Sequence, residues 1–116
     1  MNTKNFKEQE FACKCCGVIK PNSELMAVLE LVRLNFASPV TINSSYRCPK
    51  HNEEIEGAKH SKHLEGIAAD IVVKNWSSDS VYSFLNKTFP NSYGMGRYKT
   101  FTHFDVRKTK ARWDNR

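Results

Sequence analysis

One segment near the start of the chain carries apolar residues at the spacing of a helical face. They recur every three or four positions, so successive turns of a helix would present them to the same core. Asn22 or Ser23 can cap the first turn, and Ser38-Pro39 follows the last apolar position. The pattern predicts an amphipathic helix that begins near residue 23 and buries Leu25, Val28, Leu29, Val32 and Phe36.

Shorter segments have the alternation or composition of strands. β-Branched residues alternate in residues 40–44, and the apolar run 67–73 is typical of a buried strand. Residues 95–98 and 101–106 would form a final hairpin. Because side chains alternate between the two faces of a strand, His103 and Asp105 would share one face of the last strand with Phe101.

Two further helical segments complete the pattern. Residues 49–56 favour one or two turns that end at Gly57, and residues 78–89 favour a helix capped by Ser77 or Ser78 and stopped by Pro90. With 116 residues, of which 40% are hydrophobic, the chain can build one core but not two. We therefore predict a single domain over residues 1–116 of the α+β class, a small antiparallel sheet with helices against it.

Charge changes this picture only in part. The formal net charge is +6, the pI is about 9.3, and basic residues are densest in residues 107–112. Such a balance suits a polyanionic partner, either nucleic acid or an anionic bacterial wall, but it is also usual for a solvated surface. No apolar stretch approaches the roughly 18 residues of a membrane span, and the first residues lack the apolar core of a secretory signal. We predict a monomer that is cytoplasmic on synthesis.

The role of the cysteines stays open at this point. The chain has Cys13, Cys15, Cys16 and Cys48. Three thiols within four residues cannot form the disulfide framework of a secreted domain, and a cytosolic chain keeps its thiols reduced. The C-x-C-C spacing is tighter than the paired C-x-x-C knuckles of a zinc ribbon. A second, structural zinc, a cross-link to Cys48 and small buried side chains are the three interpretations.

Two histidines and an aspartate fit a metal centre. His63 precedes the buried strand 67–73, Asp70 lies within it, and His103 lies in the last strand, while His51 and His60 fit loop positions. A catalytic zinc site supplies three nitrogen or oxygen ligands and leaves the fourth place to water. Asp70 would be costly in an apolar strand without a cation. The three residues therefore predict an open zinc site whose water could attack an amide once a carboxylate took its proton.

The same residues lie in motifs that resemble the zinc D-alanyl-D-alanine carboxypeptidases, whose fold is shared with Hedgehog signalling domains. The motifs are Ser44-Ser-Tyr-Arg47, Ser61-x-His63-x-x-Gly66-x-Ala68-x-Asp70 and His103-Phe-Asp105-Val-Arg107, within a resemblance that runs from Phe6 to Trp113. The chain is most similar to the short phage and prophage branch. The resemblance implies a Hedgehog/DD-peptidase-like fold, one catalytic Zn²⁺ held by the three residues above, and hydrolysis of peptide bonds in peptidoglycan.

The resemblance also implies roles outside the ligand set. Arg47 would bind the substrate's carboxylate or its developing oxyanion, which suits its fork of donors, and Ser61 would bind substrate or shape the loop. Many members carry an acidic general base three positions before the last histidine, where this chain has Thr100. We predict that Asp105 supplies the base, with an orienting role or metal ligation as its alternatives and Glu65 as the fallback.

Three classes of function follow. A zinc peptidase acting on peptidoglycan stem peptides, as carboxypeptidase or endopeptidase, would use every motif residue. A binding module of the same fold could keep its metal for stability alone, since Thr100 replaces the usual acid. A nucleic-acid-binding protein would need a basic recognition helix, which the pattern lacks. We expect the peptidase, an endolysin-type enzyme in a phage setting, with peptidoglycan peptides and not nucleic acid as its partner.

Overall fold

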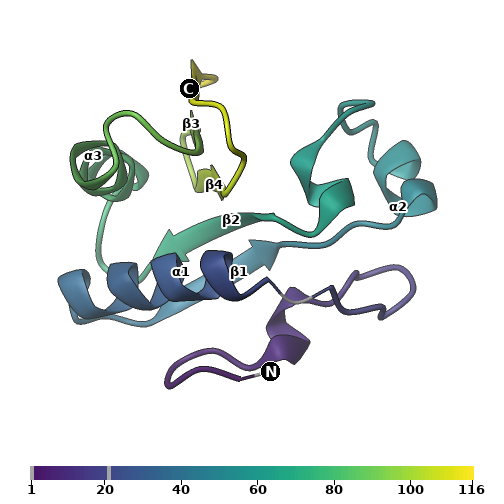
Figure 1. Ribbon diagram of the computed structural model, residues 1–116, viewed down its shortest axis with the longest axis horizontal. Coiled ribbons are helices and arrows are strands. Elements are labelled where there is room, and N and C mark those ends of the chain that lie inside the picture. The colour runs from purple at the N-terminus through teal and green to yellow at the C-terminus, as the bar shows by residue number, and fades with distance from the viewer. Residues whose placement is uncertain (1, 21) are drawn as a thin grey trace.

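A five-stranded sheet forms the centre of the computed structural model, which describes residues 2–20 and 22–116. The strand order is β1-β2-β4-β3-β5, and helices α1 and α3 pack on the sheet (Figure 1). This arrangement confirms the predicted α+β class. The strands are β1 (Val40–Ser44), β2 (Ala68–Val73), β3 (Gly94–Arg97), β4 (Thr102–Asp105) and β5 (Ala111–Asp114).

Helix α1 (Ser23–Phe36) is the predicted amphipathic helix. The Asn22 side chain accepts a hydrogen bond of 2.9 Å from the Leu25 amide and caps the first turn. The helix ends at Ala37, which takes the left-handed conformation (φ 50°) just before Ser38-Pro39. Its buried face covers β1 and β2, and each fully buried leucine or valine there stabilises the fold by about 1.5–3 kcal/mol.

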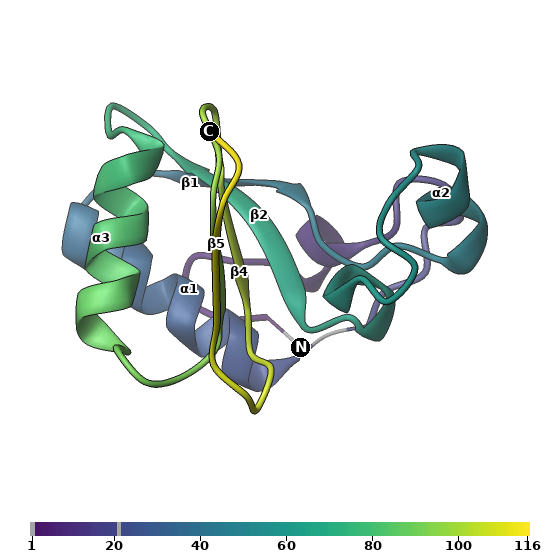
Figure 2. The same ribbon diagram turned by 90° about the horizontal axis from the view of Figure 1, so that it is seen from above.

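The other helices lie at opposite ends of the molecule. Helix α3 (Ser78–Thr88) begins at the Ser77 cap, buries Val81 and Leu85, and packs mainly on β3 and β4. Figure 2 shows α1 and α3 at one end and α2 (Pro49–Glu54) at the other. Two short 3₁₀ helices, η1 (Glu8–Phe11) and η2 (Lys62–Glu65), were not predicted from the sequence.

Strand β5 makes the sheet mixed where the sequence predicted a wholly antiparallel one. The pairs β1/β2, β2/β4 and β3/β4 are antiparallel, but β5 lies parallel to β3 and covers the edge that β4 leaves open. Trp113 of β5 packs directly over Gly96 of β3, where a Cβ atom would collide with the indole. The sequence gives little indication of this strand. It overlaps a basic segment, residues 107–112, and only Ala111 and Trp113 in it are apolar. No helix in the described part of the chain is both long and apolar enough to span a membrane.

Candidate metal centre

Sheet register brings the predicted ligands together. Strands β2 and β4 are antiparallel neighbours, and Asp70 lies directly opposite His103 in their pairing. His63 lies in η2, which ends at Gly66 in the left-handed conformation (φ 76°) before the chain enters β2. That tight turn places the His63 ring beside the strand pair.

The three side chains converge on one point. Asp70 Oδ1 lies 3.0 Å from His103 Nδ1 and 3.3 Å from His63 Nε2. One ligand atom from each residue lies within 4.8 Å of the others, as a shared metal ion requires. His63 and His103 are only 2% and 7% exposed, whereas Asp70 is partly exposed. The cluster therefore lies at the surface end of a buried strand pair.

Hydrogen bonds at the far side of each ring set which nitrogen faces the cluster. His63 Nδ1 lies 2.6 Å from the Ser45 carbonyl oxygen, and His103 Nε2 lies 2.7 Å from Asp105 Oδ2. Both partners accept only, so these nitrogens carry the ring protons. In the neutral rings, His63 Nε2 and His103 Nδ1 then face Asp70 with lone pairs, the arrangement that outer hydrogen bonds give to metal-binding histidines.

Three lone-pair donors facing one point require a positive charge there. A proton on a ring can supply it: burial lowers the pKa of His103, but the hydrogen bonds and charges of Asp105 and Asp70 raise it above its ordinary value overall. Burial raises the pKa of Asp70, yet the two histidines hold it well below its usual range, so Asp70 is a carboxylate. Zn²⁺ would supply positive charge in place of the proton and suits this donor set, which leaves a fourth place for water.

Asp105 lies behind the cluster and not in front of it. It is 0% exposed and accepts hydrogen bonds of 2.7 Å from both Nε and Nη2 of Arg107. Burial raises its pKa, but Arg107 and His103 outweigh this and keep the pKa well below its usual range. The predicted role of general base does not fit this geometry, because both oxygens are engaged and neither meets solvent. The geometry fits the alternative role of orienting the His103 ring.

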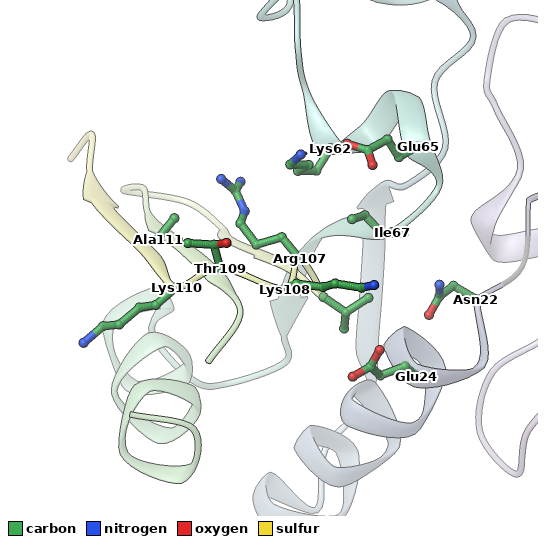
Figure 3. A pocket seen from close by; sticks show the side chains of 11 residues that line it. Asn22, Glu24, Lys62, Glu65, Ile67, Arg107, Lys108, Thr109, Lys110 and Ala111 are labelled. Atoms are coloured by element: carbon green, nitrogen blue, oxygen red, sulfur yellow. Dashed lines mark hydrogen bonds and ion pairs between the residues drawn. The ribbon is translucent and has the colours of Figure 1, made fainter. Parts of the chain in front are cut away.

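Glu65, the fallback base, faces another pocket. Its carboxylate pairs with Lys62 Nζ at 2.9 Å and is exposed. Figure 3 shows Glu65 and Lys62 on the wall of a neighbouring pocket whose other wall carries Arg107 and Lys108. Thr100 is exposed in the turn between β3 and β4 and does not line the pocket above the cluster.

A pocket of about 480 Å³ opens above the cluster and contains both predicted substrate-binding residues. Arg47 Nη2 donates to Ser61 Oγ at 3.0 Å, and the Arg47 amide donates to the His63 carbonyl at 3.1 Å. Arg47 Nε is buried without a hydrogen-bond partner. Burial lowers the pKa of this guanidinium, although Asp70 and Tyr98 partly offset the effect. Arg47 therefore lines the pocket with a guanidinium that its hydrogen bond to Ser61 holds in place.

Three aromatic residues of the pocket wall were missed from the sequence. Tyr98 and Phe101 stack with their ring centroids 4.3 Å apart, and the Trp113 centroid lies 5.0 Å from that of His103. The Trp113 Nε1 group donates to the Tyr98 hydroxyl at 3.0 Å. Trp113 lies in strand β5, which was not predicted. Tyr98 and Phe101 flank the turn of the predicted hairpin, and this position could have identified them as neighbours of the cluster.

An open His, Asp, His cluster on an α+β sheet, beneath a pocket, is an arrangement typical of metal-dependent hydrolases. The sequence profile of the Peptidase M15 family matches residues 4–105. The chain belongs to this family, which comprises zinc-dependent peptidases of the D-alanyl-D-alanine carboxypeptidase type, so the resemblance seen in the motifs is confirmed. No curated protein matches the chain.

Proposed function

We propose that the protein is a zinc metallopeptidase that hydrolyses peptide bonds in peptidoglycan stem peptides, as a D-alanyl-D-alanine carboxypeptidase or an endolysin-type endopeptidase. One observation carries the proposal: three ligand atoms within 4.8 Å of one another lie beneath a pocket whose wall includes the guanidinium of Arg47. Membership of a zinc peptidase family supports the same reaction class.

His63, Asp70 and His103 would hold the zinc. When bound there, zinc would lower the pKa of its water to about 7 and polarise the scissile carbonyl. Ser45 and Asp105 fix the two ring tautomers, so the ligand nitrogens are already aimed before metal arrives. Asp105 is in this account a positioning residue and not the proton acceptor.

Arg47 would bind a carboxylate of the substrate. Its guanidinium lines the pocket and is held there by Ser61 Oγ at 3.0 Å, so a carboxylate in the pocket would meet a positively charged fork of donors. Lys62 and Arg107 add positive charge to the same wall. Stem peptides carry free carboxylates, so a cationic wall beside the metal centre suits them better than an uncharged peptide.

The proton acceptor in this site would be His60. Outside the three ligands, it is the one described residue on the pocket wall with an imidazole or carboxylate side chain, the groups that most often act as general bases. It is exposed, two residues after Ala58 in the loop that leads to η2. A loop histidine would thus take over the work that an acid before the last histidine does in many relatives.

A non-enzymatic binding module of the same fold is the second candidate. One observation favours it: among the described residues, no carboxylate except Asp70 lines the pocket. Such a module would use the metal for stability alone. Removal of the metal would then unfold the protein without abolishing any reaction.

Digestion of purified muropeptides by the zinc-loaded protein, read by mass spectrometry, separates the two candidates. We expect release of terminal D-Ala or scission within the stem. His60→Ala should lower kcat by about 10²-fold or more at unchanged zinc content, while Lys59→Ala, a change at the exposed residue next to it, should leave kcat unchanged. Absence of cleavage by a folded wild type with bound zinc would favour the binding module.

A further inference from the structure

A second group of metal-ligating side chains lies around the start of α2. The sulfur atoms of Cys13, Cys16 and Cys48 lie within 4.8 Å of one another. Cys13 and Cys16 come from the N-terminal loop, and Cys48 precedes α2, so the group joins two segments that are far apart in the sequence. Figures 1 and 2 both show the purple N-terminal loop passing beside α2. Cys13 is buried, Cys48 partly exposed and Cys16 exposed.

The backbone around these thiols has the form of a metal knuckle. Cys13 and Cys16 bracket a tight turn closed by the Gly17 amide, which donates to the Cys13 carbonyl at 2.8 Å. Gly17 follows with φ 74°, a conformation that glycine adopts without strain. Two residues separate Cys13 from Cys16, and two separate Cys48 from His51. Structural zinc sites use this paired spacing of Cys and His ligands.

Backbone amides already point at the sulfur atoms. The Cys48 amide donates to Cys13 Sγ at 3.3 Å, and the His51 amide donates to Cys48 Sγ at 3.4 Å. Amides aimed at sulfur stabilise the thiolate, which is the form that binds metal.

We propose that Cys13, Cys16 and Cys48 bind a structural zinc ion, with His51 as the fourth ligand. Each thiol would release its proton to solvent as the metal binds, and the shell of four protein ligands would leave no place for water. Cys15 is outside the set, because its thiol does not group with those three sulfur atoms. His51 is assigned from its spacing to Cys48: its ring groups with Cys15 and Glu54, so it would have to turn toward the three thiols to complete the shell.

The position of this site gives it a consequence for the pocket. Cys48 directly follows Arg47, and the amide of the preceding Tyr46 donates to the Phe11 carbonyl at 3.3 Å. A metal joining Cys48 to the N-terminal loop would therefore fix both ends of the short segment from which the Arg47 side chain enters the pocket.

Metal content of matched variants tests the proposal independently of peptidase activity. Protein purified with reductant and Zn²⁺ and then desalted should hold two zinc ions per chain by elemental analysis. Cys16→Ser should hold one, as should His63→Ala, whereas Cys15→Ser, a change at the adjacent and equally exposed thiol, should keep two. Cys16 is exposed, so serine there disturbs no packing and leaves a folded protein to measure. One zinc in the wild type that Cys16→Ser does not reduce would overturn the site.

Cobalt substitution adds a readout that only thiolates give. The Co²⁺-loaded wild type and His63→Ala should both show a strong sulfur-to-cobalt charge-transfer band in the near ultraviolet, and Cys16→Ser should lose it. His51→Ala should weaken Co²⁺ binding at the thiolates by tenfold or more. If Cys15→Ser lost the charge-transfer band and His51→Ala kept it with unchanged Co²⁺ affinity, the assignment of the fourth ligand would be overturned. Protein purified without reductant but with Zn²⁺ present gives a further check. A disulfide to Cys48, seen as a mass lower by two hydrogen atoms, would overturn the metal site in favour of a cross-link.

Discussion

The two clusters of metal-ligating side chains differ in how many ligands they offer and in what lies above them. The His63, Asp70 and His103 cluster offers three ligands and opens into a pocket of about 480 Å³. The cysteine group offers three thiols, with a histidine three residues beyond Cys48. An incomplete shell leaves room for water and substrate, whereas a complete shell can only hold segments together. The proposed reactivity of the open cluster therefore depends on the fourth coordination place, which the protein does not fill.

They also differ in what holds the ligands in place. Asp70 and His103 lie on paired strands. The Ser45 carbonyl holds the His63 ring, and Asp105, itself held by Arg107, holds the His103 ring. The cysteines lie on a turn and at a helix cap, where backbone amides donate to the sulfur atoms of Cys13 and Cys48. A catalytic metal needs the stiffer support, because small displacements of a ligand are costly to the reaction.

The largest expected effect comes from removing one ligand of the open cluster. His63→Ala should lower kcat/KM on a muropeptide by about 10³-fold or more, since the lost metal supplies several kcal/mol to the transition state and 1.36 kcal/mol is tenfold in rate. The thiolate-bound zinc should remain. Chelation followed by added Zn²⁺ should restore the wild type and not the variant. Equal activity of variant and wild type would contradict the assigned ligand set.

Arg47 directly precedes Cys48 in the sequence and lines the pocket above the open cluster. Arg47→Ala should raise KM by about 10–100-fold for a peptide with a free terminal carboxylate, because a charge-assisted hydrogen bond contributes about 1.5–3 kcal/mol. For the same peptide with an amidated terminus, KM should change little. Steady-state kinetics on the matched peptides measures both, and equal losses on the two would show that Arg47 does not bind that carboxylate.

Asp105→Asn tests the bracing behind the open cluster. Zinc affinity should fall by about 10–100-fold, as is usual when the outer partner of a metal-bound histidine is lost. Activity should largely return at saturating Zn²⁺, measured by titrating metal against rate. Arg107→Lys keeps the charge but loses the paired contact, so it should weaken zinc binding in the same direction by less. A fully loaded Asp105→Asn protein that stays inactive would instead restore Asp105 as the base.

Salt should produce the smallest effect, and only on an intact wall. Lys108 and Lys110 are exposed beside the pocket drawn in Figure 3. Their attraction to an anionic wall is screened as the Debye length falls from about 10 Å at 0.1 M to about 3 Å at 1 M salt. The rate on whole walls should drop several-fold over that range, while the rate on a short soluble peptide stays constant. Parallel salt curves for the two substrates would rule out electrostatic wall binding.

Much of this arrangement follows from sequence patterns, and the exceptions have physical causes. Helical spacing predicted α1, and strand alternation placed His103 and Asp105 on one face, where the structure has them in contact at 2.7 Å. Alternation could not show that the Asp105 carboxylate is shielded from solvent. That depends on Arg107, whose side chain turns back two residues to cover the carboxylate.

Strand β5 was beyond sequence reasoning for another reason. Residues 111–114 are a short, half-buried segment, and its pairing depends on the edge of β3 that β4 leaves free. The cysteine spacing was harder to interpret. Cys15 and Cys16 are adjacent, so the sequence does not show that Cys13 and Cys16 act as a C-x-x-C pair. Only the fold shows which thiol of the pair faces Cys48 and Cys13.

The tryptophan that β5 places against His103 gives this protein an optical probe of its own metal centre. The ring centroid of Trp113 lies 5.0 Å from that of His103, and the second of the two tryptophans, Trp76, packs at a tilt against Phe36 at the C-terminal end of α1. Trp76→Phe would keep that aromatic contact and leave a single indole emitter. Quenching of Trp113 by Co²⁺ or Cu²⁺ would then report occupancy of the open cluster in real time, without added dye and without any substrate.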